Sequence, residues 1–341
     1  MNEGSLVISL DFELHWGVHD SRTLESYGRN LLGVRNAVPA MLDLFAEFGI
    51  HATWATVGFL FHETRAELLR NLPAIKPEYE DPTLSPYSLI KHIGENEASD
   101  PYHFAPSLIR RICQSPGQEI ASHTYSHFFC MERGAEMAAF AEDLLAARRV
   151  AEQSAIPLRS VAFPRNQYTY AHLAICRQLG FCAYRGNAAS ALYRSRTKRE
   201  AKGWMLRGAK FADAYVPFSG RNISRGIPAS PTAPAMIPAS RFLRPYHPAL
   251  RSLDQVRFFR ITSGMAAAAR AGNIYHLWWH PHNVGINVAE NMAFLRRILE
   301  AYSRLNVEHR MRSLNMSELA DQMAVIGERA MPAGEMGVCA V

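Results

Sequence analysis

The strongest constraint on the fold is the order of its apolar segments, in which runs typical of strands alternate with segments whose apolar residues have helical spacing. Residues 5–13, SLVISLDFE, form a short run rich in leucine and β-branched residues, which is typical of a buried strand. Residues 33–49 place apolar side chains at near-helical spacing and end at Gly49, and residues 50–61 predict a second strand. A strand, a helix and a strand in succession favour parallel pairing and therefore an α/β fold.

The same alternation continues along most of the chain. The later segments predict helices over 136–154, 170–180, 252–271 and 287–304, and strands over 159–167, 181–186 and 273–282. Two stretches rich in proline, 72–104 and 188–250, are expected to be irregular insertions. We expect one domain over residues 1–325 and a flexible tail over 326–341.

The composition indicates a soluble globular protein and excludes several functional classes. Hydrophobic residues make up 48% of the 341 residues, and the formal net charge is +6, which is mild for a nucleic-acid-binding protein. The basic segment 193–203 is expected to be a solvated loop, with attraction to an anionic membrane face or an anionic sugar as the alternative. Its five cysteines form no C-x-x-C pair, so neither a disulfide framework nor a thiolate zinc site is expected.

The location and the assembly state are less constrained by the sequence. No stretch combines a basic start with an apolar segment of signal length, and none approaches the ~18 continuous apolar residues of a membrane span. We therefore expect a cytoplasmic protein, with peripheral membrane association left open. The sequence does not indicate an oligomeric state.

Acids and imidazoles gather at the predicted ends of three strands. These clusters are Asp11 with Glu13, His123 with His127, and His280 with His282. In a parallel α/β barrel the carboxyl ends of the strands share one face, where their loops form the active site. The three clusters are therefore expected to converge, although they lie far apart in the sequence.

The residue types in these clusters point to metal-assisted hydrolysis. Two histidines at i and i+4 with one carboxylate, and one position open to water, are a common catalytic zinc set. Alternation along a strand places Asp11 and Glu13 on the same face, so one can bind the metal while the other acts as a base. A histidine at the mouth of a strand can protonate a leaving group, and His280 and His282 compete for this role. Their neighbours Trp278 and Trp279 are expected to include at least one core residue.

These motifs resemble the polysaccharide deacetylase family, the NodB-homology domain of carbohydrate esterase family 4. The resemblance runs from about residue 5 to residue 285, and SHTYSH at 122–127 contains the family's H-[ST]-x-x-H motif. It implies a distorted (β/α) barrel of about seven parallel strands with a divalent metal ion, usually zinc. The chain differs in its first motif, where Phe12 separates the acids, and in FPRN at 163–166; YRGN at 184–187 is a candidate for the fourth motif.

The family roles carry over to particular positions of this sequence. Asp11 resembles the catalytic base, and Glu13, His123 and His127 resemble the metal ligands, with the two acids open to exchange. The remaining assignments are Arg165 as the arginine that orients the base, His280 as the general acid, and Asn166, Trp279 and His282 as substrate-binding residues.

The resemblance implies removal of an N-acetyl or O-acetyl group from a carbohydrate. We expect an intermediate of surface polysaccharide or glycolipid biosynthesis as the substrate. Two alternatives remain: a degenerate member of the fold that binds carbohydrate without turnover, and a hydrolase of a linear or cyclic amide that is not a sugar.

Overall fold

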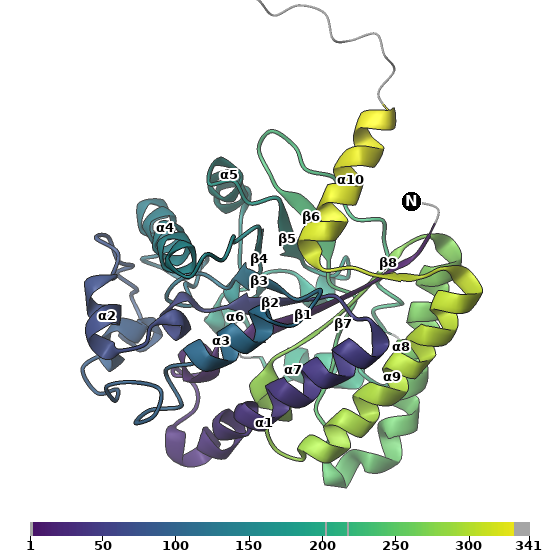
Figure 1. The fold of residues 1–341 in the computed structure, drawn as a ribbon, viewed down its shortest axis with the longest axis horizontal. Helices are drawn as coiled ribbons and strands as arrows, with labels where there is room; N and C mark the ends of the chain where they lie inside the picture. Colours follow the sequence, from purple (N-terminus) through teal and green to yellow (C-terminus); the bar gives the residue numbers. More distant parts are fainter. Residues whose placement is uncertain (1–2, 202, 217, 331–341) are drawn as a thin grey trace, which may run out of the picture.

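The computed structural model describes residues 3–201, 203–216 and 218–330, which fold around one curled parallel β-sheet (Figure 1). In spatial order the strands run β6-β5-β4-β3-β2-β1-β8-β7, β9 pairs with β1, and all these pairs are parallel. The strand bounds are β1 Ser5–Phe12, β2 Ala52–Thr56, β3 Glu119–Ser122, β4 Ser160–Val161, β5 Ala183–Gly186, β6 Ala235–Pro238, β7 Arg241–Phe242, β8 Ile274–Trp279 and β9 Arg312–Ser313. This arrangement confirms the predicted α/β fold with a parallel sheet.

Helices lie around the outside of the sheet, with α1, α8 and α9 on one side of it and α4 and α5 on another (Figure 1). Helices α4, α5 and α8 agree closely with the predicted ones, whereas α1 begins at Leu24, nine residues before the predicted start at residue 33. The helix bounds are α1 Leu24–Phe48, α2 Arg65–Arg70, α3 Pro106–Cys113, α4 Met137–Gln153, α5 Tyr170–Gln178, α6 Lys198–Ala201, α7 Trp204–Ala212, α8 Asp254–Ala271, α9 Val288–His309 and α10 Met316–Ala330.

Strand β1 is buried along its whole length and separates two environments. Its even-numbered side chains, from Leu6 to Phe12, join the hydrophobic core that also includes residues of α1 and α9. Ser9 and Asp11 alternate with them and contact polar groups of other strands on the opposite face. The predicted strand therefore delivers a carboxylate to the inside of the curled sheet while its apolar side chains hold it in place.

The two ends of the sheet are formed by neighbouring segments of the chain. Between β6 and β7, the Ala239 amide donates to the Gly186 carbonyl in β5, and the Ser240 amide donates to the His276 carbonyl in β8. Residues 235–242 therefore contact both edges of the sheet and curl it toward a barrel. Counted as one element, this segment gives seven strand positions apart from β9, as predicted.

The expected irregular insertion at 188–250 was therefore wrong at its carboxyl end. Pro234 and Pro238 interrupt the apolar pattern there, but Pro238 lies at the last position of β6, where the ladder ends. Within 72–104 the structure has two short 3₁₀ turns, at Pro82–Leu84 and Pro86–Leu89, and an isolated bridge from Asn96 to Thr64, which agrees with an excursion. Of the expected tail, residues 326–330 continue α10, and 331–341 lie outside the described residues.

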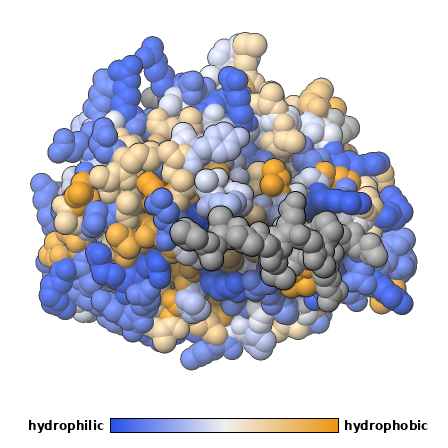
Figure 2. Space-filling model, turned by 90° about the horizontal axis from the view of Figure 1, so that it is seen from above, coloured by the Kyte–Doolittle hydropathy of each residue, from blue (hydrophilic) through white to orange (hydrophobic). Residues whose placement is uncertain are grey.

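Two observations concern the surface. No helix of the described ranges has the length and hydropathy needed to cross a membrane. On the face shown in Figure 2, hydrophobic residues are interspersed among hydrophilic ones.

Helix α1 packs directly against the loop that follows β8. A Cβ atom added to Gly33 in α1 would lie 1.7 Å from the Gly285 carbonyl oxygen, and one added to Gly285 would lie 2.0 Å from the Asn30 carbonyl oxygen. Both obstacles are backbone atoms, which cannot rotate away. This close approach fixes the segment 280–285, which begins with His280.

Substitution of Gly33 should therefore destabilise the protein. We expect Gly33→Ala to lower the free energy of unfolding by about 1–3 kcal/mol, because the backbones must separate to admit the methyl group. Urea denaturation measures this change. The matched control is Gly208→Ala in α7, where no atom lies within 4 Å of the added Cβ; it should be neutral or stabilising by up to ~1 kcal/mol. Equal effects of the two substitutions would contradict the packing described.

Candidate metal centre and active site

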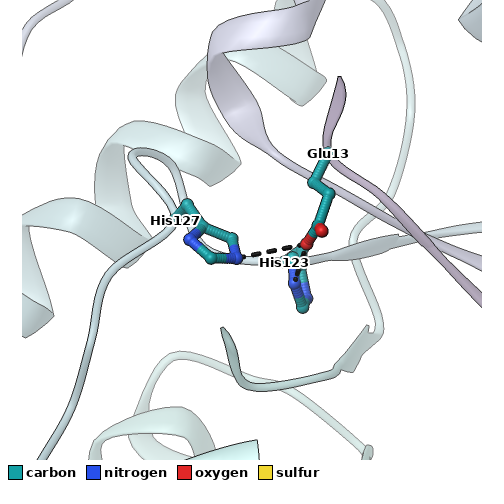
Figure 3. A group of neighbouring side chains, drawn as sticks. All are labelled: Glu13, His123 and His127. Atoms are coloured by element: carbon teal, nitrogen blue, oxygen red, sulfur yellow. Dashed lines mark hydrogen bonds and ion pairs between the residues drawn. The ribbon is translucent and has the colours of Figure 1, made fainter. Parts of the chain in front are cut away.

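Three predicted ligands meet at the carboxyl ends of β1 and β3. The Nε2 atoms of His123 and His127 each lie 3.1 Å from Oε2 of Glu13, and all three side chains are buried. Figure 3 shows both imidazole rings directed at this carboxylate. One potential ligand atom from each residue lies within 4.8 Å of the others, so the group could hold a metal ion.

The hydrogen bonds of His123 fit the group to a cation. Its Nδ1–H donates to the Ala162 carbonyl at 2.8 Å, and this bond directs Nε2 at Glu13, where it could serve as a metal ligand. Burial lowers the pKa of His127 to about 4, so this imidazole is neutral near pH 7. Burial would raise the pKa of Glu13, but the surrounding histidines hold it well below its ordinary range. Two imidazole nitrogens and a carboxylate oxygen that face one another are the donor set of a catalytic divalent-metal site.

The turn that carries both histidines is strained and firmly held. Thr124 and His127 have left-handed backbone angles, with φ of 61° and 59°, which are rare for residues other than glycine. The buried carboxylate of Asp143 in α4 accepts hydrogen bonds from the amides of Tyr125 at 2.6 Å and Ser126 at 3.1 Å. These bonds compensate the strain and aim the two imidazoles at Glu13.

The other first-strand acid forms a buried ion pair with Arg185 of β5. Its guanidinium donates two hydrogen bonds to Asp11, at 2.6 and 2.7 Å, and both side chains are buried. Burial on its own would raise the pKa of Asp11, but Arg185 outweighs this effect and holds the pKa below its ordinary range. Asp11 is therefore ionised at neutral pH.

Arg165 does not make the contact predicted for it. Its guanidinium pairs with Asp20 and lies over the ring of Phe129, with 4.2 Å from Cζ to the ring centroid. The reason is the backbone at Arg165, whose φ of 53° places it in a tight turn after β4. The role of orienting Asp11 passes to Arg185, and this corrects the prediction.

Asn166 lies beside this pair, and its predicted role in substrate binding stays a prediction. Its Oδ1 accepts a hydrogen bond of 3.2 Å from Nη2 of Arg185. Its carbonyl accepts hydrogen bonds from Asn187 and Ser195. Asn166 therefore connects the buried ion pair to the segment that follows β5.

The late histidine cluster also reaches the first-strand acids. Nε2 of His280 lies 3.6 Å from both Oδ2 of Asp11 and Oε1 of Glu13. The Nδ1 atom of His280 accepts a hydrogen bond of 3.2 Å from Nδ2 of the Asn283 side chain. In the neutral ring the proton is therefore on Nε2, facing the acids. His282 stacks on His280 and lies 3.9 Å from Glu13.

Exposure distinguishes the two histidines. The side chain of His280 is 23% exposed, whereas that of His282 is 4% exposed. Burial lowers the pKa of His282 to about 3, so it stays neutral. His280 is therefore the histidine that a substrate can reach.

Trp279 is a core residue, and its predicted role in substrate binding is wrong. It is fully buried, and its ring packs edge-on against Phe45 of α1 at 6.4 Å. Strand alternation turns its neighbour Trp278 to the opposite face, where Arg185 lies 4.3 Å above its ring. The tryptophan beside the site is therefore Trp278.

The family model for polysaccharide deacetylases matches residues 31–184, a segment that includes His123 and His127. This match assigns the segment 31–184 to the polysaccharide deacetylase family. The match begins after the first-strand acids and ends before Arg185 and His280. The presence of those side chains in the site therefore rests on the geometry described above.

Solved structures share this fold over nearly the whole chain. A Mycobacterium smegmatis protein described as a polysaccharide deacetylase is 14% identical with a TM-score of 0.60, and covers 100% of this chain and 96% of its own. A Pseudomonas aeruginosa PAO1 protein described in the same way is 13% identical with a TM-score of 0.56. The match covers 96% of this chain and 91% of that protein. PuuE allantoinase is 14% identical with a TM-score of 0.56. The match covers 94% of this chain and 89% of the allantoinase chain. No curated protein sequence matches the chain.

Arg185 is the site residue that sequence reasoning did not assign. The available signal was YRGN at 184–187, a charged residue inside a short strand. A buried arginine in a strand needs an anion, and the acids at the end of β1 supply it.

Removal of Arg185 should destabilise the fold, because it leaves the Asp11 carboxylate buried without a cation. We expect Arg185→Ala to lower the free energy of unfolding by about 3–5 kcal/mol, and Asp11→Asn in the same chain to restore part of the loss. The control is Arg296→Ala, which breaks the exposed ion pair with Glu47 and should cost at most ~1 kcal/mol. A loss for Arg185→Ala as small as that of the control would show that the buried pair does not hold the site.

Proposed function

We propose that this chain is a metal-dependent hydrolase that removes an acetyl group from an N-acetylated or O-acetylated carbohydrate. The observation that carries the proposal is the convergence of Glu13, His123 and His127 next to the Asp11–Arg185 pair and His280. Family membership supports the reaction class, and the carbohydrate substrate is what the family name implies. Zinc is the metal we propose, because two histidines and one carboxylate are a frequent zinc set.

The residues divide the chemistry between them. A divalent cation held by Glu13, His123 and His127 would supply the positive charge that polarises the acyl carbonyl and makes a water molecule more acidic. Asp11, kept ionised by Arg185, would accept the proton of the attacking water. His280 would donate the proton on Nε2 to the departing sugar nitrogen or oxygen as the bond to the acyl carbon breaks. The low exposure of His282 favours a role in positioning His280.

The biological setting is part of the proposal. We propose an acetylated intermediate of surface polysaccharide or glycolipid biosynthesis as the substrate, and the cytoplasmic location stays a prediction. The likeness in fold to PuuE allantoinase favours one alternative, hydrolysis of an amide that is not a sugar. Acetate release distinguishes the two reactions, because only deacetylation produces it.

The experiment is metal analysis coupled to acetate release from N-acetylated sugars. The wild-type chain should bind about one zinc ion per molecule and release acetate. His127→Ala removes one of the three metal ligands. This variant should therefore lose most of the metal and reduce acetate release roughly 100-fold or more. His92→Ala, which changes an exposed histidine, is the control and should behave as the wild type.

Two outcomes would contradict the proposal. A His127→Ala variant with full metal content and turnover would remove the assigned ligand. A wild-type chain with stoichiometric metal and no acetate release from any acetylated sugar would favour a non-sugar amide or a binding protein.

A further inference from the structure

A cavity of about 380 Å³ lies beside the candidate active site. His280 and Trp278 form part of its lining, so the cavity adjoins the histidine that faces Asp11 and Glu13. Much of the remaining wall comes from residues 188–214, within the segment expected to be an irregular insertion. The cavity therefore belongs to the entrance of the site, and its lining bears on the substrate.

The lining is strongly cationic. No aspartate or glutamate occurs among the lining residues, whereas six lysine or arginine side chains do. These are Arg165, Arg194, Arg196, Lys210, Arg241 and Arg244.

Only some of these charges are neutralised by protein acids. Arg165 pairs with Asp20, and Arg241 lies 3.6 Å from Asp213. Among the residues that the structure describes, the other four form no ion pair within 4.0 Å: Arg194, Arg196, Lys210 and Arg244. The cavity therefore holds a surplus of positive charge within one small volume.

This surplus has an energetic cost in the free protein. Lys210 is partly buried, and burial together with nearby Arg196 lowers its pKa. Arg244 is also partly buried, and its Nη2 donates to the Lys210 carbonyl, which places the two residues side by side. Like charges held together away from water repel one another, and an anion in the cavity would relieve this repulsion.

We propose that the cavity binds the phosphate or diphosphate group of a phosphorylated acetyl-sugar, and that the acetyl group then reaches the centre next to His280. This inference rests on the proposed function, since it names the class of substrate for the same site. Several cations suit a diphosphate, which carries several negative charges and many acceptor oxygens. A single carboxylate would leave most of the surplus charge unpaired.

Aromatic side chains complete the lining. Tyr193, Phe242 and Trp278 line the same cavity, and the ring of Phe242 packs against both Trp278 and His280 at 4.8 and 5.7 Å. Aromatic faces suit the apolar face of a sugar ring, while the cations hold its phosphate. The sugar would then lie between the cationic wall and the reacting centre.

The first test is binding of inorganic pyrophosphate, measured by calorimetry on the metal-loaded chain. We expect Lys210→Gln and Arg244→Gln each to weaken binding at least 10-fold, and Arg207→Gln to leave it unchanged. Arg207 is exposed on the same helix as Lys210 but does not line the cavity, so it is the matched control. Pyrophosphate held by the metal alone would bind all these variants equally, which would overturn the proposal.

A thermal measurement tests the repulsion itself. Without pyrophosphate, Lys210→Gln should melt at the same temperature as the wild type or higher, because one of the repelling charges is gone. A large decrease in its melting temperature would show that Lys210 stabilises the fold and would contradict the proposed surplus charge.

The second test compares acetate release from an N-acetylhexosamine with that from its diphosphate-linked form. We expect kcat/KM to be at least 100-fold higher for the diphosphate, and Lys210→Gln to reduce this preference at least 10-fold through KM. Equal values for the two substrates would overturn the phosphate site and leave deacetylation standing. Specific pyrophosphate binding without acetate release from any substrate would keep the phosphate site and reject deacetylation.

Two arms distinguish the sources of the diphosphate. One uses a nucleoside-diphosphate N-acetylhexosamine, and the other uses the same sugar on a polyprenyl diphosphate in phosphatidylcholine vesicles. Trp204 is 82% exposed on α7, the helix that carries Lys210, and provides a probe of membrane contact. Trp204→Ser should lower turnover only in the vesicle arm if the carrier is a lipid, and in neither arm if it is a nucleotide.

Discussion

The parallel pairing of β1 with β2 and β8 is the constraint on which the rest of the structure depends. The register sets Asp11 opposite Ala55, and Leu10 opposite Trp279, so the chain beyond β8 begins level with the first-strand acid. This pairing brings carboxylates and His280 together across nearly the whole length of the sequence. Because the region is buried, each carboxylate must have a partner, and Arg185 and the histidines provide it.

The groups that balance the buried negative charge differ between Asp11 and Glu13, and this difference suits the two carboxylates to different chemistry. Asp11 is neutralised by a fixed cation of the protein, so its ion pair is complete without any ligand. Glu13 instead faces the Nε2 atoms of His123 and His127, and these three ligand atoms could hold a cation from outside. The same sheet therefore places a carboxylate paired with an arginine beside a carboxylate that could bind a metal ion.

Much of this could be predicted from the sequence, because the pattern of apolar segments carries the fold. The strand ends at Asp11, His123 and His280 follow from apolar runs that stop at polar residues, and the H-x-x-x-H spacing follows from the motif. The strand at 235–242 was hidden by Pro234 and Pro238, although hydrogen bonds to both edges hold it in place. The places of Arg185 and Trp278 in the site could not be predicted, because they depend on which face of a short strand points inward. A shift of one residue in the register of the strand reverses that face. The direction of the Arg165 side chain depends on the left-handed backbone angle at this residue, which the sequence pattern does not reveal.

The most direct test of this account is anomalous X-ray diffraction at the zinc edge from crystals of the chain grown with zinc. We expect a single strong peak about 2.0–2.2 Å from Oε2 of Glu13 and from the Nε2 atoms of His123 and His127. Asp11 should remain paired with Arg185 and away from the ion. A peak bound by other side chains, or imidazoles turned away from Glu13 with no ion between them, would contradict it.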